Sequence, residues 1–250
     1  EYGRKRRTAI ENAEEAVYEE KKMEEMEVCF LMDRFGYMKL IDKNAYERNK
    51  EAVHNESKYV FNCMNTDKIC IFTDTGKMHT IKAADIPLVR FRDKGTPVDN
   101  LSNYDSAQER MLYVAPVGQI RTDRLLFVTK TSMCKLVEGA EFDVAKRTIA
   151  STKLAEEDEL IFIGSASEME QVVLQSHNGC FLRFLTQEIS TMKKTALGVR
   201  GMKLTDGDYL DNAYLLAGHQ EYVISYHDKE YALNKVRLAK RDTKGIKPRI

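Results

Sequence analysis

From Val28 onward, apolar and polar positions alternate with a period of two, which is typical of half-buried β-strands. The pattern predicts five hairpins, each with an apolar strand, a polar tight turn and a second strand. They span Cys29–Ile41, Cys70–Lys82, Leu126–Glu138, Val173–Leu185 and Val223–Lys235. The turns are centred on Gly36, Gly76, Ser132, Gly179 and Lys229. Asn178-Gly179 is the strongest turn signal, because both residues tolerate positive φ; Ser132 and Lys229 predict turns of another length or shape.

A second pattern follows the hairpins: a Gly-led strand, then an acidic turn and another apolar strand. The Gly-led strands are Gly95–Leu101, Gly198–Leu204 and the shorter Gly245–Ile250, and the apolar strands are Glu156–Gly164, Asp206–Ala217 and, more loosely, Asn55–Cys63 and Ser106–Pro116. Four short strands recurring roughly every 40–56 residues predict an all-β, propeller-like array, in which neighbouring sheets bury each other's faces. The alternative is a β-sandwich with accidental likeness between hairpins. A WD-repeat propeller is disfavoured, since the chain has no Trp.

The chain divides into two parts. Residues 1–27 predict a charged helix, with Ile10, Ala13 and Val17 on one face, and residues 28–250 hold about five four-stranded units. No apolar run is long enough to cross a membrane, and the first residues do not form a signal peptide, so we expect a cytoplasmic protein. The five scattered cysteines predict small buried side chains without disulfides.

Catalytic and metal-binding patterns are missing from the sequence. The histidines, His54, His79, His177, His219 and His227, have no metal-ligand spacing, and the sequence has neither a phosphate-binding Gly-rich loop nor a serine elbow. His177 and His227 fall at matching places in two turns, which favours a structural role. We therefore expect a non-catalytic chain without a metal or cofactor.

Basic residues recur between the second hairpin strand and the following strands, although the net charge of the chain is zero. If the units are blades of one array, these segments share a rim, and their cations can follow a curved phosphate backbone without reading bases. The alternative is ordinary solubilising charge; recurrence at matching places favours DNA binding. The candidate DNA-binding residues are Arg90, Arg92, Lys94, Lys146, Arg147, Lys153, Lys193, Lys194, Arg200, Lys203, Arg237, Lys240, Arg241 and Lys244.

Several segments resemble the C-terminal domain of the A subunits of bacterial type IIA topoisomerases, DNA gyrase and topoisomerase IV. They are Phe35–Lys39, Thr73–Lys77, Ile86-Pro87, Lys94–Val98 with Asn100-Leu101, and Gly198–Leu204 with Asp206–Asp208; Lys5–Thr8 and Ile10 resemble the segment that joins this domain to the catalytic core. The resemblance spans nearly the whole chain.

This resemblance implies a β-pinwheel, a propeller variant whose blades exchange strands, preceded by a linker helix. It implies wrapping or bending of double-stranded DNA, so that one duplex is presented for strand passage. The catalytic tyrosine would lie outside this chain, and ATP and Mg²⁺ would belong to other parts of the parent enzyme. The implied partners are DNA and, within a heterotetramer, the ATPase B subunit together with the rest of the A subunit. We expect a monomeric isolated domain in the cytoplasm, associated with the nucleoid.

One departure from the family affects the expected activity. The A subunits of gyrase carry the heptapeptide Gln-Arg-Arg-Gly-Gly-Lys-Gly in the first blade, whereas the comparable stretch here, Arg48–Lys58, has no glycine. A stretch without flexible glycines and clustered arginines cannot act as the same DNA latch. The sequence therefore favours a protein like topoisomerase IV, with a divergent gyrase left open. The second interpretation is a protein-interaction propeller that binds no nucleic acid.

Overall fold

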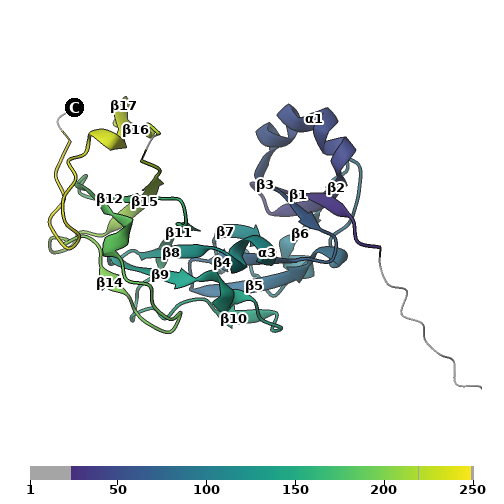
Figure 1. Ribbon diagram of the computed structural model, residues 1–250, viewed down its shortest axis with the longest axis horizontal. Coiled ribbons are helices and arrows are strands. Elements are labelled where there is room, and N and C mark those ends of the chain that lie inside the picture. Colours follow the sequence, from purple (N-terminus) through teal and green to yellow (C-terminus); the bar gives the residue numbers. More distant parts are fainter. Residues whose placement is uncertain (1–23, 219, 249–250) are drawn as a thin grey trace, which may run out of the picture.

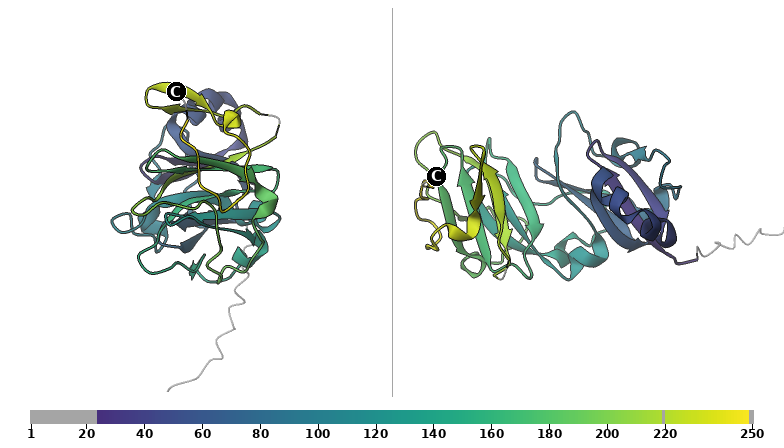
Figure 2. Two further views of the ribbon diagram at one scale, coloured as in Figure 1. Left: turned by 90° about the vertical axis from the view of Figure 1, so that its left-hand side faces the viewer. Right: turned by 90° about the horizontal axis from the view of Figure 1, so that it is seen from above.

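The computed structural model describes residues 24–218 and 220–248, which form a series of small antiparallel sheets. Each hairpin places alternating apolar side chains on both faces of a sheet, so every sheet needs a neighbour on each side. The sheets follow one another along an arc, with the first and fifth units at its opposite ends (Figure 1). Two further views show them standing side by side, with helix α1 against the first sheet (Figure 2).

The elements fall into five units, each built on one hairpin. The first has β1 (Glu27–Asp33), β2 (Tyr37–Asp42), α1 (Lys43–Glu56) and β3 (Ser57–Met64). The second has β4 (Lys68–Thr73), β5 (Lys77–Lys82), η1 (Ala83–Asp85), β6 (Thr96–Pro97), α2 (Val98–Leu101) and β7 (Met111–Pro116), followed by α3 (Val117–Arg121). The third has β8 (Arg124–Thr129), β9 (Met133–Glu138), η2 (Gly139–Phe142), β10 (Thr148–Ala150) and β11 (Leu160–Ser165). The fourth has β12 (Gln171–Ser176), β13 (Phe181–Leu185), η3 (Thr186–Glu188), β14 (Val199–Arg200) and β15 (Leu210–Leu216), and the fifth has β16 (Val223–Tyr226), β17 (Lys229–Ala232) and η4 (Leu233–Lys235).

Consecutive units exchange strands. The sheet orders are β3-β1-β2-β6, β10-β5-β4-β7 and β11-β8-β9-β14, followed by β13-β12-β15 and β16-β17. After its hairpin, the chain therefore adds a short strand to the preceding sheet (β6, β10 or β14) and returns to close its own sheet with β7, β11 or β15. The fifth unit repeats the first step, because Ile246 bridges Phe181 of β13. This exchange confirms the predicted pinwheel and makes each sheet depend on the next unit.

The core lies between the sheets. One cluster joins the first two units through Phe30, Met38 and Ile71; a second joins units two and three through Phe72 and Phe127, and a third joins units three and four. The outer face of the first sheet has no preceding sheet, and helix α1 covers Cys29, Leu31 and Ile41 there. A single end helix thus supplies the apolar cover that a neighbouring sheet supplies elsewhere.

The glycine turns follow the sequence prediction. The turn at Ser132 was expected to have another length or shape and does not, whereas the fifth turn differs from the others, as expected. Gly36, Gly76 and Gly179 have positive φ, and Ser132 adopts the same left-handed conformation at φ 72°. In the fifth unit the turn is His227-Asp228, both with positive φ, and Lys229 is the first residue of β17. That hairpin therefore has a two-residue turn, shorter than the others.

Two expectations concern the N-terminal end. The helix predicted over residues 1–27 lies mostly outside the described residues; Glu24–Met26 have no regular secondary structure and Glu27 begins β1. The stretch Arg48–Lys58, compared above with a flexible loop, is mostly the second half of helix α1. Asp42 caps this helix by accepting a hydrogen bond from the Ala45 backbone N–H at 2.8 Å, an interaction that stabilises helix N-termini.

Candidate nucleic-acid interface

The segments that carry the candidate cations follow one path in units two to five. We call them the crossover segments; they span residues 83–110, 139–159, 186–209 and 233–248. Each lies beside the second hairpin strand of the preceding unit. Backbone hydrogen bonds hold them there: Val89 N–H donates to Leu40 O at 2.9 Å, and Met192 N–H to Leu136 O at 2.8 Å. The same edge of each sheet therefore receives the same cationic segment.

Neighbouring crossover segments also contact one another. Asn103 Nδ2 donates to Thr148 Oγ1 at 3.0 Å, joining the second and third units. The Lys153 backbone N–H donates to Lys194 O at 3.1 Å, joining the third and fourth units, and the Lys203 N–H donates to Thr243 O at 3.0 Å, joining the fourth and fifth. The four segments thus form one continuous strip, which we call the crossover edge.

Gly95 allows one of these segments to approach its strand closely. A Cβ atom at this position would lie 2.3 Å from the Met38 carbonyl oxygen, which is too close for any side chain. The following residue, Thr96, pairs with Met38 in the sheet. Glycine therefore precedes this strand because a larger residue would not fit where the exchanged strand approaches β2.

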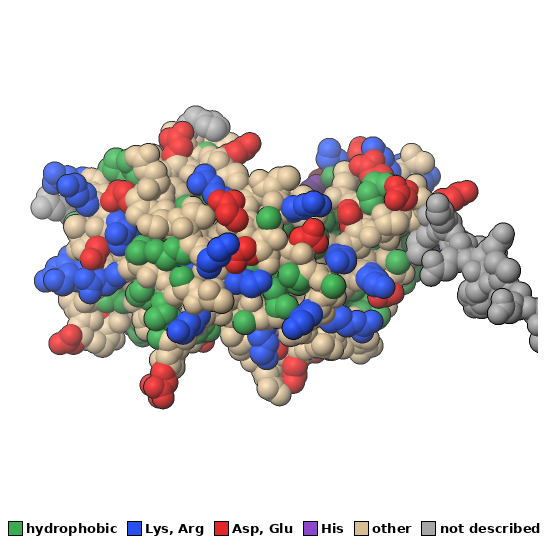
Figure 3. Space-filling model, turned by 60° about the horizontal axis from the view of Figure 1, so that its bottom comes forward, with side chains coloured by type: hydrophobic (Ala, Val, Ile, Leu, Met, Phe, Trp, Pro, Cys, Tyr) green, Lys and Arg blue, Asp and Glu red, His purple; other side chains and the backbone are tan. Residues whose placement is uncertain are grey.

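Most candidate cations point into solvent from this edge. Lys194 and Arg241 are half-buried and the other candidates are exposed. Figure 3 brings forward the lower edge of Figure 1, where β10 and β14 lie, and shows Lys and Arg side chains along its whole length with Asp and Glu among them. Among the exposed candidates, those without a carboxylate at ion-pair distance in the described part of the chain are Arg90, Arg92, Lys94, Lys146, Arg147, Lys153, Lys203, Arg237, Lys240 and Lys244.

Two candidates are partly neutralised by carboxylates. Arg200 binds Asp242 through two hydrogen bonds, the longer of which joins Nη2 and Oδ2 at 3.1 Å. The hydrogen bond from Arg200 lowers the pKa of Asp242, so this ion pair persists near neutral pH. Lys193 Nζ lies 3.7 Å from Glu141 Oε1. These two cations are less available to a phosphate than their neighbours.

Two further candidates bind the protein itself. Lys194 Nζ donates to the Glu141 carbonyl at 2.8 Å. Arg241 Nε donates to the Glu188 carbonyl at 3.1 Å, and its Nη1 donates to the Arg200 carbonyl. Sequence position alone placed these residues with the exposed cations, but their side chains connect crossover segments.

Sequence reasoning missed three cations inside the second hairpin strands. Lys39 in β2, Lys135 in β9 and Arg183 in β13 donate to backbone carbonyls of the next unit's crossover segment. The signal in the sequence was a single basic residue within an apolar strand. We call Lys39, Lys135 and Arg183 the loop-binding cations.

A buried polar cluster holds the same edge in the second unit. His79 Nε2 lies 3.0 Å from Glu109 Oε2, and Lys77 Nζ lies 3.0 Å from Glu109 Oε1. Burial alone would raise the pKa of Glu109, but hydrogen bonds from His79 and Lys77 outweigh it and lower the pKa to about 2. His79 also contacts Thr148 Oγ1 of β10 at 3.1 Å, so the cluster connects the hairpin to the exchanged strand.

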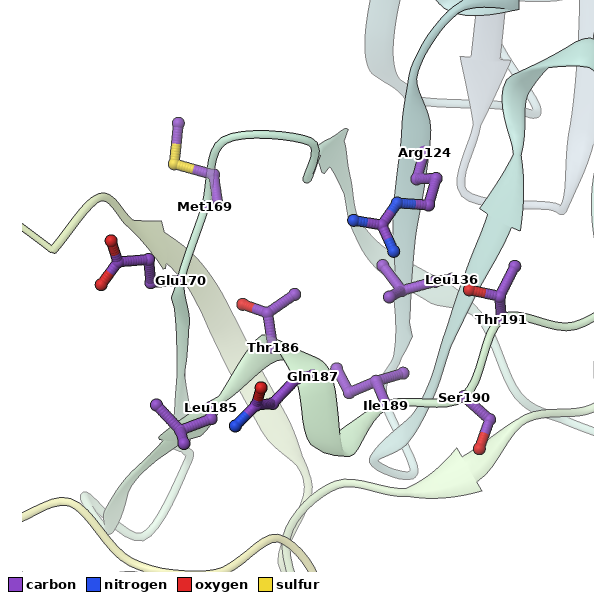
Figure 4. Close-up of a pocket in the computed structure, with 10 residues that line it drawn as sticks. All are labelled: Arg124, Leu136, Met169, Glu170, Leu185, Thr186, Gln187, Ile189, Ser190 and Thr191. Atoms are coloured by element: carbon purple, nitrogen blue, oxygen red, sulfur yellow. The ribbon is translucent and has the colours of Figure 1, made fainter.

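One pocket among the described residues has no histidine or cysteine in its lining. This pocket of about 650 Å³ lies between the hairpins of units three and four, with Arg124 and Glu170 on opposite sides (Figure 4). The Ser and Thr hydroxyls of that lining therefore have no imidazole base beside them, and the lining contains no thiol nucleophile. Across the described residues, no group of three His, Cys, Asp or Glu side chains is placed to bind a metal ion. Nor does any helix in that part of the chain have the length and apolarity needed to span a membrane.

The model of the family "DNA gyrase C-terminal domain, beta-propeller" matches residues 67–106, 123–167 and 170–216. These matches cover more than half of the chain, and each corresponds to one unit, from the second to the fourth. The chain belongs to this family.

The curated relatives of this family member include A subunits of DNA gyrase from several bacteria. The protein from Clostridium acetobutylicum is 28% identical over 212 residues, covering 80% of this chain and 25% of the relative. That from Mycoplasma genitalium is 26% identical over 263 residues, covering 99% of this chain and 31% of the relative. The chain therefore spans between a quarter and a third of the length of these relatives.

Solved structures share the fold of this family member. The C-terminal domain of DNA topoisomerase IV superposes with a TM-score of 0.78 at 22% identity, covering 89% of this chain and 72% of the other. The E. coli ParC C-terminal domain gives 0.69 at 13% identity, with 89% and 94% covered. The DNA gyrase A C-terminal domain gives 0.59 at 18% identity, with 88% and 76% covered.

Proposed function

We propose that this chain binds and bends double-stranded DNA along the crossover edge. The observation that carries the proposal is the recurrence of solvent-exposed Lys and Arg side chains on four crossover segments that are hydrogen-bonded into one strip. Cations without a carboxylate partner attract phosphates and release condensed counterions, with no need to read bases. We therefore expect binding that depends on salt and is indifferent to sequence.

The arrangement along an arc supports bending. A duplex that follows cations on successive sheets must curve with them, and bending 20–30 base pairs costs roughly 1–6 kcal/mol. Several phosphate contacts along the edge offset that cost. The sheets are packed against one another through buried aromatic and aliphatic side chains, so their curvature is set before DNA arrives.

In the parent enzyme, this chain would shape one duplex for strand passage by an ATP-dependent type II topoisomerase. The family and the names of the relatives support an A-subunit origin. The catalytic tyrosine would then lie outside this chain, and ATP and Mg²⁺ would act elsewhere. The partners would be the ATPase B subunit of a heterotetramer, together with the rest of the A subunit. We further propose a monomeric isolated domain that acts in the bacterial cytoplasm on nucleoid DNA.

The first unit supports a topoisomerase IV-like activity more than a gyrase-like one. Arg48–Lys58 has no glycine and folds mostly into helix α1, whose apolar residues Ala45 and Val53 pack on the first sheet. A packed helix cannot extend along DNA as a glycine-rich loop does. Relaxed circular DNA incubated with the domain and a topoisomerase tests this point, since trapped writhe of one sign would indicate gyrase-like wrapping.

A gel-shift experiment with linear duplex over a range of salt concentrations tests the proposal itself. Replacing Arg90, Arg92 and Lys94 together with Ala should weaken binding to all sequences alike. Each lost phosphate contact should reduce the slope of log K against log salt by about 0.9, or roughly 2–3 for the triple variant.

The matched control removes three exposed cations outside the crossover segments, Lys43, Lys50 and Lys58. It changes the net charge equally, so binding that falls equally in both variants would show that only total charge matters. No binding of the wild type at low salt, or binding insensitive to salt, would instead favour the second candidate, a protein-interaction propeller.

A further inference from the structure

The loop-binding cations lie inside the sheets. Lys39 pairs with Leu31 across the first hairpin, and Lys135 pairs with Phe127 at the same register of the third. Lys135 is only 1% exposed. A side chain with so little access to solvent cannot reach a phosphate on a bound duplex, so its charge must serve another purpose.

Their partners are the carbonyls of the crossover segments. Lys135 Nζ donates to Lys194 O at 2.7 Å and to Ala196 O at 2.6 Å. Lys39 Nζ donates in the same way to Asp93 O at 2.9 Å and to Phe91 O. In each case a basic residue of one unit binds two carbonyls, two residues apart, in the segment that carries the edge cations of the next unit.

The fourth unit uses a cation at another position, and this cation binds an earlier part of the crossover segment, ahead of the bridge between Arg183 and Leu238. Arg183 Nη1 donates to Val236 O at 3.0 Å and to Asn234 O, again two carbonyls two residues apart. Arg183 is one residue further along its strand than Lys39 and Lys135 are along theirs, and the matching residue there is Leu182. In the second unit that register holds His79, which contacts Thr148 through its side chain. Of the four contacts between a second hairpin strand and the next unit's crossover segment, three thus use a cation and two carbonyls.

Burying the Lys135 ammonium group costs free energy of desolvation. We take this cost as a sign that the group holds the crossover segment in place. Burial lowers the pKa of Lys135 to about 8, because the ammonium group has lost most of its hydration. Two carbonyl acceptors and the Phe127 ring, whose centroid lies 5.8 Å from Nζ, compensate in part. An apolar side chain would avoid the desolvation but would leave the two carbonyls without this donor.

We propose that Lys39, Lys135 and Arg183 are positioning residues for DNA binding, each setting the path of the next unit's cationic crossover segment without touching the duplex. This inference rests on the proposed function. It assigns two classes of cation to the domain: exposed ones that contact phosphates, and the loop-binding cations, which determine where those contacts lie and therefore how far the duplex bends.

The experiment compares Lys135→Met with Lys135→Arg in the full chain. Met retains the length and apolar body of the side chain but has no donor, whereas Arg retains a charged donor. Hydrogen exchange measures the order of residues 190–198, salt-dependent gel shifts measure binding, and energy transfer between dyes at the two ends of a duplex measures bending.

We expect Lys135→Met to exchange faster within residues 190–198, with the hairpin β8–β9 unchanged, and to bend the duplex less. Its salt slope should fall by about 0.9 for each phosphate contact that the misplaced segment loses. Lys135→Arg should restore both order and bending. A purely structural role would increase exchange while leaving energy transfer in the complex unchanged, and that result would overturn the inference, as would unchanged exchange.

Lys39→Met provides a second variant if Lys135→Met fails to fold, because Lys39 is less buried and its loss costs less. Its expected effect lies in residues 88–95. Failure of the proposed function would look different, because the wild type itself would then show no salt-dependent binding. Wild-type binding that is weakened by the Arg90, Arg92 and Lys94 replacement but not by either Met variant would overturn only this inference.

Discussion

Asp242 offers a way to change one ion pair on the crossover edge. Its carboxylate accepts two hydrogen bonds from Arg200, whose side chain is 53% exposed. Asp242 has φ 61°, in the left-handed region, where Asn is among the best-tolerated residues. Asp242→Asn therefore removes the negative charge while keeping the local backbone, and it leaves the Arg200 guanidinium without its carboxylate.

The expected magnitude follows from one added phosphate contact. If the released Arg200 contacts DNA, the slope of log K against log salt becomes steeper by about 0.9. Between about 50 and 200 mM salt, the advantage of the variant over the wild type should then shrink by a factor of roughly 3.5. The variant should bind more tightly at low salt and approach the wild type as screening increases.

Fluorescence anisotropy of a labelled duplex of about 30 base pairs, titrated at several salt concentrations, measures both quantities. The matched control is Asp211→Asn, which removes one negative charge from a different contact, between Asp211 Oδ2 and His177 Nδ1, 3.1 Å apart. Equal changes in the two variants would refute the reasoning, because they would show a response to total charge. Weaker binding by Asp242→Asn would refute it as well.

Two further predictions concern stability and accessibility. Because the pKa of Glu109 is depressed to about 2 in the folded state, its ionisation stabilises the fold above about pH 4.5, and this stability is lost as pH falls toward 2. Glu109→Gln should therefore have a lower Tm than the wild type at pH 7, and its Tm should fall less between pH 4.5 and pH 2. A Tm that depends on pH as in the wild type would contradict the stabilising role of the Glu109 carboxylate. Thiol titration of the native protein should label Cys180, which is half-buried, well before the buried Cys29, Cys63, Cys70 and Cys134, and equal labelling of all five would contradict the fold.

The hairpins could be predicted because their signals are local. Alternation of side chains and a turn residue with positive φ act within about a dozen residues, so Gly36, Gly76 and Gly179 marked their turns correctly. Ser132 was harder to place, since its left-handed conformation is imposed by the surrounding sheet, with its hydroxyl accepting a hydrogen bond from the Met202 N–H at 2.7 Å. Helix α1 was missed because its stretch has little helical periodicity, and packing on the first sheet stabilises it.

The candidate interface was predicted in outline for a different reason. The cations recur at fixed places relative to the hairpins, and equal places in repeated units share one edge. What could not be predicted was which cations are available. Arg200 and Asp242 are 42 residues apart in sequence, and Lys135 and Ala196 are 61 apart. No local pattern connects such residues.

By itself, the sequence determined the all-β class, the five repeated hairpins and the distribution of charge among them, since these depend on side-chain periodicity over short distances. The tertiary structure alone decided that each crossover segment adds a strand to the preceding sheet. It also decided which basic side chains face solvent and which bind carbonyls inside the sheets. Both outcomes depend on the packing of whole sheets, which brings together backbone and side chains that are far apart along the chain.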